Sequence, residues 1–159
     1  MTRVNARQYH NENYKKVVEL AVGPLGQSRK VAEKVISWVQ TVEYAEVFVA
    51  EVEGEVVGFI EMEYPPREDW AKIAYIAWIA VEDEHRRKGY GSRLIQVGEE
   101  SARRRGMRRL YVEPTAREDY AICFYVTNGL MPEGRRIGYY PDSIILGKSL
   151  WRNHPDKPS

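Results

Sequence analysis

The chain has 159 residues, 43% of them hydrophobic and 30% charged, which are the proportions of a folded domain rather than of a disordered chain. Its formal net charge of +1 argues against bulk attraction to nucleic acid or to a membrane. A single cysteine, Cys123, excludes an internal disulfide framework, and no apolar run approaches the ~20 residues of a membrane span. We therefore expect a cytoplasmic protein with one domain over residues 1–152 and a loose tail over 153–159.

Hydrophobic periodicity predicts an alternation of strands and helices along the chain. Alternating or continuous apolar runs predict strands over residues 2–8, 46–53, 56–64, 72–82, 108–113, 135–140 and 143–150. Apolar residues at helical spacing predict helices over 11–22, after the cap Ser28, over 92–105 and over 117–128. The predicted order is therefore β-α-α-β-β-β-α-β-α-β-β.

Local patterns add detail to this order. The strand over 72–82 is apolar on both faces, which indicates a central position in a sheet. The tripeptide at 53–55 predicts a tight hairpin turn. Glu61 and Glu63 are interpreted as a solvated hairpin face, with attraction of a cationic acceptor as the alternative, and Cys123 as a small buried residue. The second helix is expected to bury a stripe made of Val31, Val35, Trp38, Val39 and Val42.

The most informative segment, Arg86-Arg87-Lys88-Gly89-Tyr90-Gly91, joins the predicted central strand to the helix over 92–105. A strand, a glycine turn and a helix N-terminus form an anion site, because free N–H groups and the helix dipole point at one spot. The spacing fits neither the P-loop, since Lys88 precedes Gly89, nor the dinucleotide fingerprint, which needs a glycine at Leu94. The segment predicts a pyrophosphate cradle, with an ordinary turn and a solvated basic face as the alternative.

The pattern Arg-x-x-Gly-x-Gly in this segment resembles the acyl-CoA signature of the GNAT superfamily of acyltransferases. A second segment, residues 118–130, resembles the other signature of that family. It matches the family pattern at Ala121, Phe124, Tyr125 and Gly129. Glu118 stands where the family usually has Asn, and Leu130 replaces an aromatic residue. Two distant motifs in the correct order are far more specific than either motif alone.

The resemblance implies an α/β fold with a mixed, mostly antiparallel sheet of about seven strands, flanked by helices and split into a V between the fourth and fifth strands. It also implies acetyl-CoA as co-substrate, with pantetheine in the V, the pyrophosphate in the cradle and no metal. His10, His85 and His154 lack the spacing of metal ligands. The residues expected to bind the donor are Ile79, Ala80, Val81, Arg86, Arg87, Lys88, Gly89, Tyr90, Gly91, Ser92, Glu118 and Tyr125.

Acyl transfer from a thioester to an amine needs a neutral amine, a donor for the developing oxyanion and an acid for the leaving thiolate. Tyr125 matches the family position whose phenol points at the CoA sulfur, so it is the expected acid, with a core tyrosine as the alternative. Glu113 lies twelve residues before it, which resembles the base–acid spacing of the ribosomal-protein alanine N-acetyltransferase branch. Glu113 is the expected base, with an exposed strand-end glutamate as the alternative, and Glu82 is a second candidate.

Together these features predict an N-acetyltransferase that moves the acetyl group of acetyl-CoA to a primary amine by direct attack in a ternary complex. The acceptor stays open between a protein or peptide N-terminus, a lysine side chain and a small amine. The segment Tyr139-Tyr140-Pro141-Asp142 weakly resembles the substrate segment of peptide N-terminal acetyltransferases. Trp70 and Trp78 are candidates to wall the acceptor pocket, although core packing is the stronger interpretation for Trp78.

Two functions from other classes stay open. A non-catalytic acyl-CoA-binding regulatory module would keep the cradle without turnover. A domain that associates with RNA or the ribosome would use the arginines at 103–105 and 108–109, which the near-neutral net charge disfavours. We expect no nucleic acid and no membrane among the partners. A homodimer is compatible with the resemblance, because many relatives pair edge strands or helices.

Overall fold

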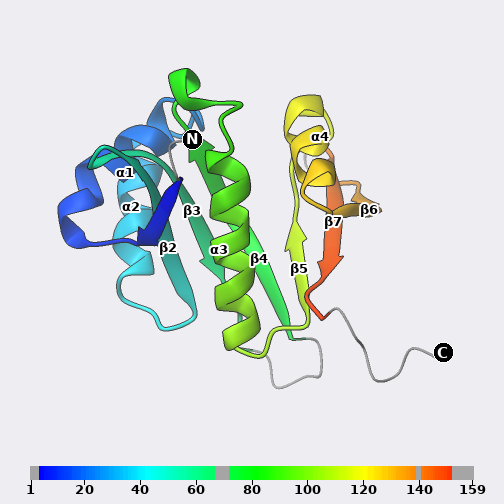
Figure 1. The fold of residues 1–159 in the computed structure, drawn as a ribbon. Helices are drawn as coiled ribbons and strands as arrows, with labels where there is room; N and C mark the ends of the chain where they lie inside the picture. The colour runs from blue at the N-terminus through cyan, green and yellow to red at the C-terminus, as the bar shows by residue number, and fades with distance from the viewer. Residues whose placement is uncertain (1–3, 67–71, 139–140, 152–159) are drawn as a thin grey trace.

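The structure, a computed structural model, describes residues 4–66, 72–138 and 141–151. The strands in these ranges are β1 (Asn5–Gln8), β2 (Ala45–Val52), β3 (Glu55–Glu63), β4 (Ile73–Val81), β5 (Arg109–Val112), β6 (Met131–Arg136) and β7 (Ser143–Ser149). The helices are α1 (Tyr14–Val22), α2 (Arg29–Val39), α3 (Tyr90–Arg104) and α4 (Asp119–Thr127), with 3-10 turns η1 (Asn11–Asn13) and η2 (Asp83–His85). This succession confirms the predicted order of elements (Figure 1).

Some predictions fall outside the described residues. These are the start of the strand predicted over 2–8, Trp70, the pair Tyr139-Tyr140 and the tail over 153–159. The assignment of residues 1–152 to a single domain stays a prediction.

The strands form one mixed sheet in the order β1-β2-β3-β4-β5-β7-β6. Neighbouring strands are antiparallel except β4 and β5, which are parallel, and β4 lies in the middle as predicted. Because successive side chains of a strand point to opposite faces, Phe59 of β3 packs with α1 and α2, whereas Ile60 packs with α3. Figure 1 shows α3 in front of the sheet and α1 and α2 behind it. The predicted α/β fold is confirmed.

The sheet is split between its two middle strands. β4 and β5 pair only where Ile73–Tyr75 faces Arg109–Tyr111, and beyond these residues the strands diverge. On its other edge β4 carries a bulge, because Glu61 of β3 pairs with Trp78 and Met62 pairs with Ile76, which leaves Ala77 as the extra residue. The parallel strands therefore diverge toward their carboxyl ends, from which α3 and α4 follow along the chain.

The hairpin turn between β2 and β3 follows the prediction. Glu53 and Gly54 have positive φ values of 50° and 83°, the signature of a two-residue type I′ turn.

The buried stripe of α2 differs from the prediction. The buried residues are Ala32, Ile36 and Val39, whereas Val31 is 41% exposed. Val35, Trp38 and Val42 are half-buried at the edge of the interface. Val31 and Val35 lie next to Ala32 and Ile36 along the helix, so two neighbouring faces look alike in the sequence, and the choice between them depends on α1, which packs beside α2.

The prediction of a strand over 135–140 is wrong in its bounds. The strand β6 spans Met131–Arg136 and so begins four residues earlier. Every residue of β6 is exposed, so the strand has no alternating apolar pattern that the sequence could reveal. Its position is set instead by its partner, with Met131 opposite Gly147 and Arg136 opposite Ser143 of β7.

Candidate active site

A cleft of about 760 Å³ occupies the split in the sheet. Its walls are β4 from Ile76 to Val81, the segment from His85 to the first turn of α3, and α4. All residues expected to bind the donor line this cleft except Lys88. Beyond Tyr75, β4 has no strand partner on the β5 side within the described part of the chain, so the backbone groups on that edge face the cleft.

The end of the cleft beside α3 is built from backbone amides. Gly89 is the N-cap of α3, with a left-handed φ of 87°. The N–H of Arg93 donates to the Gly89 carbonyl over 3.0 Å, which begins the helical hydrogen bonds. The N–H groups of the first turn, from Tyr90 to Ser92, therefore have no acceptor inside the helix and give its N-terminus a partial positive charge. This arrangement suits a bound diphosphate.

The two glycines of the cradle have different structural reasons. A Cβ built on Gly89 meets no atom within 4 Å, so at this position glycine is favoured by the backbone conformation alone. A Cβ built on Gly91 would lie 2.9 Å from Cζ of Phe124, which is too close. Gly91 is therefore needed for the close approach of α4 to α3, and not only for the approach of a ligand.

The basic side chains of the cradle are engaged to different degrees. Arg86 donates from Nε to the Val81 carbonyl over 3.3 Å and forms an ion pair with Asp83 at 3.0 Å. Arg87 lines the cleft with a left-handed φ of 59°, a conformation that costs energy for a residue with a side chain. Lys88 is exposed. Of these cations, Arg86 and Arg87 are therefore the ones placed to face an anion in the cleft.

Tyr125 lies on α4, which forms one wall of the cleft, and the residue is 7% exposed. Burial, and to a lesser extent the negative charge of Glu118, raise the pKa of Tyr125 above its usual value, so the phenol is protonated at neutral pH. Hydrogen bonds fix the helix end next to it: Leu130 N–H donates to the Tyr125 carbonyl and Gly129 N–H to the Val126 carbonyl. The site thus holds a protonated phenol on a helix whose end is fixed by backbone hydrogen bonds.

Glu118 fixes the segment that precedes α4. Its Oε2 accepts hydrogen bonds from the backbone N–H of Thr115 over 2.8 Å and from the Thr115 hydroxyl over 2.9 Å. It also lines the cleft. Glu118, which stands at the family's usual Asn position, therefore still holds the segment that leads into α4. Contact with the donor stays a prediction.

Glu113, the expected base, lines the cleft but is paired with neighbours. It accepts hydrogen bonds from Arg136 Nε over 2.5 Å and from the Ser143 hydroxyl over 2.6 Å. Burial raises the pKa of Glu113, but the Ser143 hydrogen bond and the Arg136 ion pair together outweigh it, so the pKa lies below its usual value. A carboxylate held in this way is a weak proton acceptor, and its role as base stays a prediction.

Glu82, the second candidate base, is not among the residues that line the cleft. It contacts Lys16 of α1, and its Oε2 lies 3.1 Å from Nδ1 of His85. The ring of His85 lines the cleft and stands edge-to-face against Tyr90 at 5.9 Å. Glu82 therefore connects α1 to the segment that leads into the cradle. His85 is expected from the sequence to be a turn residue beside the cradle, and it ends the turn η2 there.

Two further interpretations need correction. Glu61 is 1% exposed, so the expected solvated hairpin face is wrong at this position. It lies on the same face of β3 as Phe59, opposite Trp78 of β4. Burial, followed by repulsion from Glu63, raises the pKa of Glu61 to about 8, and its Oε1 has no hydrogen-bond partner in the described part of the chain. The sequence pattern of β3 could not reveal that α1 and α2 cover the face on which Glu61 and Phe59 lie.

Cys123 is exposed and lines the cleft, so its expected burial is also wrong. The sequence of α4 is apolar on all sides from Tyr120 to Val126 and therefore gives no indication of which face is buried. Trp78 both packs in the core beneath α1 and α2 and lines the cleft.

A second groove, of about 360 Å³, lies beside the split. Tyr75 and Tyr111 line it with ring centroids 6.2 Å apart, and Glu133 and Arg136 contribute charge. Val112 and Glu113 line both this groove and the cleft. The two hollows therefore share one boundary, at the end of β5.

Comparison with known proteins places this chain in a family. Residues 14–130 match the model of the acetyltransferase (GNAT) family. The chain therefore belongs to the GNAT family, as its two motifs indicated. No relative was found among curated proteins.

Solved structures with the same fold include several N-acetyltransferases. The ribosomal-protein-S18-alanine N-acetyltransferase from Escherichia coli has 20% identity and a TM-score of 0.78, covering 98% of this chain and 99% of its own. Ard1 from Thermoplasma volcanium has 22% identity and a TM-score of 0.78, covering 94% and 99%. The NatC complex bound to Gag peptide and CoA has 18% identity and a TM-score of 0.76, covering 92% and 98%. At such identities the likeness concerns the fold.

Two features are absent from the described residues. No helix there is long and apolar enough to cross a membrane. No group of three or more His, Cys, Asp or Glu residues there is arranged to hold a metal ion.

Proposed function

We propose that the protein transfers the acetyl group of acetyl-CoA to a primary amine within a ternary complex. One observation carries this proposal. The cleft joins a row of free helix N-terminal amides to a protonated phenol, that of Tyr125, along the unpaired edge of β4. Family membership supports acyl transfer, and the volume of the cleft is in the range that holds a ligand of this size.

The donor would be bound mainly by backbone groups. The N–H groups of Gly89 to Ser92 would take the pyrophosphate, with Arg87 adding charge. The free edge of β4 would pair with the amides of the pantetheine as an added strand does. The bulge residue Ala77 lies in the stretch of β4 that lines the cleft, where a backbone N–H would polarise the thioester carbonyl.

The chemical step needs one proton donor and one proton acceptor. The neutral amine attacks the thioester carbon, the new C–N bond forms and the C–S bond breaks, and the leaving thiolate takes the proton of Tyr125. The proton lost by the amine goes to water or to Glu113. Because Glu113 lies at the boundary of the two hollows, we propose that the amine arrives through the second groove.

The acceptor is a primary amine on a protein, a peptide or a small molecule. A structural neighbour, the NatC complex, is bound to a peptide and CoA. The arginine cluster has less free positive charge for binding RNA than its sequence suggests. Three of its members, Arg103, Arg105 and Arg109, form ion pairs with Glu99, Glu46 and Glu133.

The test is a release assay for free thiol with acetyl-CoA over peptides, lysine-bearing proteins, polyamines and aminoglycosides. We expect one class to release thiol in proportion to acetylated product. In parallel, acetyl-CoA and CoA should both raise the melting temperature. A thermal shift without thiol release on any acceptor would favour the non-catalytic acyl-CoA-binding module. The absence of both would refute the cradle.

A further inference from the structure

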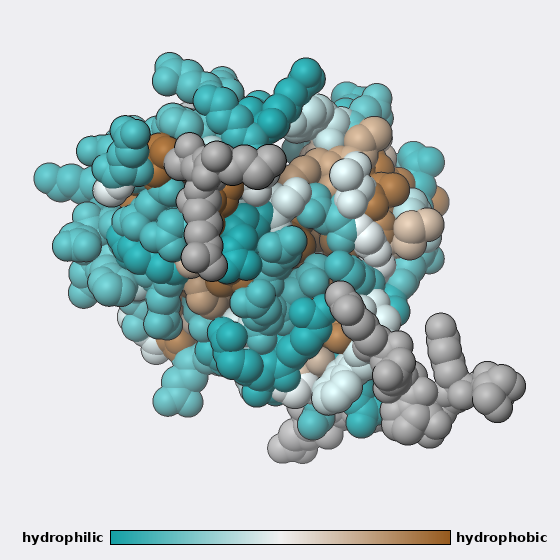
Figure 2. Space-filling view, viewed as in Figure 1, coloured by the Kyte–Doolittle hydropathy of each residue, from teal (hydrophilic) through white to brown (hydrophobic). Residues whose placement is uncertain are grey.

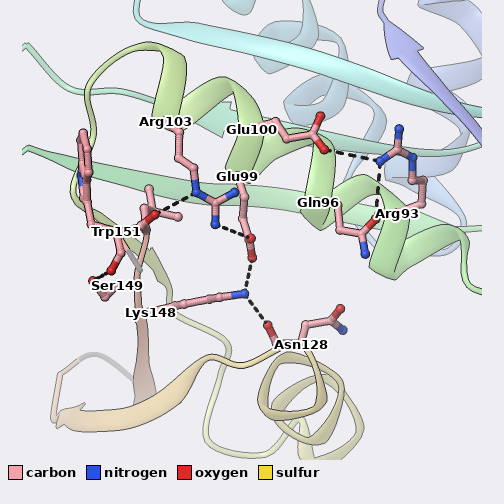
Figure 3. Close-up of polar contacts among 10 residues, drawn as sticks. Arg93, Gln96, Glu99, Glu100, Arg103, Asn128, Lys148, Ser149 and Trp151 are labelled. Carbon is pink, nitrogen blue, oxygen red and sulfur yellow. Dashed lines mark hydrogen bonds and ion pairs between the residues drawn. The ribbon is translucent and has the colours of Figure 1, made fainter. Parts of the chain in front are cut away.

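A chain of charged and polar groups links α3 to the end of α4 on the side of the sheet away from α1 and α2. Lys148 of β7 donates from Nζ to Glu99 Oε1 over 2.7 Å and to the backbone carbonyl of Asn128 over 3.1 Å (Figure 3). Arg103 holds the other oxygen of Glu99 at 3.3 Å and donates to the Leu150 carbonyl over 2.8 Å. We call the contacts of Glu99, Lys148 and the Asn128 carbonyl the strut.

The strut is buried where it meets α3. Glu99 is 6% exposed. The side chain of Lys148 passes so close to Gly129 that a Cβ built on this glycine would lie 3.3 Å from Nζ. A buried ion pair gives little net stability, because desolvation of both charges offsets their attraction. The strut is therefore better explained by what it holds in place than by the stability it adds.

The strut holds the helix end that carries Tyr125. Asn128 is the C-cap of α4, and its carbonyl is one of those that a helix leaves without an internal donor. An ammonium group at that end also complements the helix dipole. Tyr125 lies three residues before it, in the last turn. A shift of the Asn128 carbonyl would therefore shift the phenol as well.

Two contacts then fix α4 against α3. One is the packing of Phe124 on Gly91, and the other is the strut at Glu99. They are separated by about 12 Å along α3 and about 6 Å along α4, at 1.5 Å per residue. Two separated contacts fix orientation as well as distance. This matters because β4 and β5, the strands that join the two arms of the V, pair over three residues only.

We propose that Lys148 is a positioning residue, which, through Glu99 and the Asn128 carbonyl, fixes the Tyr125 hydroxyl relative to the donor cradle on α3. This inference rests on the proposed function, in which Tyr125 protonates the leaving thiolate. Lys148 and Glu99 themselves lie outside both GNAT motifs and are not among the residues that line the cleft.

The first test is a mutant cycle measured with acetyl-CoA and the best acceptor. Lys148→Met and Glu99→Gln should each lower kcat about tenfold and change the Kd of CoA less than about twofold, because misplacing a catalytic group affects the chemical step. Lys148→Arg, which keeps the charge and donors, should recover most of the rate. In a Tyr125→Phe background Lys148→Met should cost nothing further. Additive losses in that cycle would overturn the proposal.

The matched control is Glu100→Gln. Glu100 is the neighbour of Glu99 on α3, but its ion pair, with Arg93 at 3.6 Å, stays within the same helix (Figure 3). This variant should keep the wild-type kcat. If Glu100→Gln lowers kcat as much as Glu99→Gln does, then loss of any negative charge from α3 has the same effect. That result would overturn the proposal.

A second readout needs no turnover. In the wild type, CoA should slow hydrogen exchange in the first turn of α3 and also at Asn128 to Leu130. In Lys148→Met, CoA should still protect α3 but no longer slow exchange at the end of α4. If the wild type releases no thiol, the proposed function fails while this arm still decides whether the strut couples the helices. Unchanged protection of α4 in the variant would overturn the strut.

Discussion

The two arms of the split sheet are built differently. In the N-terminal arm, β2, β3 and β4 have eight or nine residues each, and α3 has fifteen. In the C-terminal arm, β5 has four residues, α4 has nine, and β6 is exposed along its whole length. Figure 2 shows apolar surface gathered over α4, whereas the surface over α3 is hydrophilic.

This difference separates binding from chemistry in the proposed function. The larger arm carries the cradle and the edge of β4, both made of backbone held by regular structure. The smaller arm carries Tyr125 on a short helix, and a helix of this length depends on its tertiary contacts. We therefore expect changes in the smaller arm to lower turnover, and changes at the cradle to lower donor affinity.

The largest expected effect on activity is that of Tyr125→Phe. Loss of the acid should lower kcat about 100-fold and leave the Kd of CoA within about twofold, as measured by thiol release and calorimetry. Tyr120→Phe is the control, because Tyr120 lies on the same helix and lines the cleft but is 59% exposed. Equal losses in both variants would remove the assignment of the acid to Tyr125.

The second prediction concerns Glu61 in the larger arm. Because the pKa of Glu61 is raised to about 8 in the folded protein, the folded state binds a proton that the unfolded state releases above its ordinary pKa near 4.5. The contribution of protonated Glu61 to the free energy of unfolding is therefore fully present below about pH 4.5 and is lost as the pH rises to about 8. Glu61→Gln should remove this fall and exceed the wild type in unfolding free energy by about 4 kcal/mol at pH 8, since each pKa unit is worth about 1.4 kcal/mol.

Denaturation in urea at pH 5 and at pH 8 measures this effect. Glu55→Gln, at an exposed position of the same strand, is the control and should follow the wild type at both values. Parallel pH curves for Glu61→Gln and the wild type would show that Glu61 is ionised in the fold.

The third prediction compares the two ends of α3. Gly89 and Gly106 have similar positive φ values, 87° and 74°, and a Cβ on either meets no atom within 4 Å. Alanine at each should therefore lower stability by a similar amount, about 1–2 kcal/mol. Only Gly89→Ala should also weaken CoA binding, about tenfold, because its Cβ and altered backbone disturb the first-turn amides. Equal CoA affinities in the two variants would place the diphosphate elsewhere.

The smallest expected effect is at Glu118. Glu118→Ala removes the acceptor for both donors of Thr115 and should raise the KM for acetyl-CoA about threefold, since the segment before α4 is held less firmly. Glu118→Asn puts back a side-chain oxygen and should bring the KM close to that of the wild type. An unchanged KM in Glu118→Ala would mean that the Thr115 contacts do not affect donor binding.

The sequence revealed those parts of the site that depend on local structure. The local geometry of the proposed cradle could be predicted because a strand, two glycines and a helix N-terminus follow one another within a few residues. The place of Tyr125 on the last helix could be predicted because it belongs to a motif on that helix. The contact of Arg136 with Glu113 could not be predicted, because it depends on the register of β6, whose residues carry no apolar pattern. Lys148 and Glu99 meet across 49 residues of chain, and neither lies in a motif.

The three-residue ladder between β4 and β5 leaves the edge of β4 from Ile76 to Val81 inside the molecule without a strand partner in the described residues, a condition usually met only at the rim of a sheet. A molecule with amides spaced along an extended backbone would occupy that gap as a missing strand does, and would join the arms along more of their length. Protease resistance of the segment from β5 to β7 should therefore report how much of the protein is loaded with donor at a given moment.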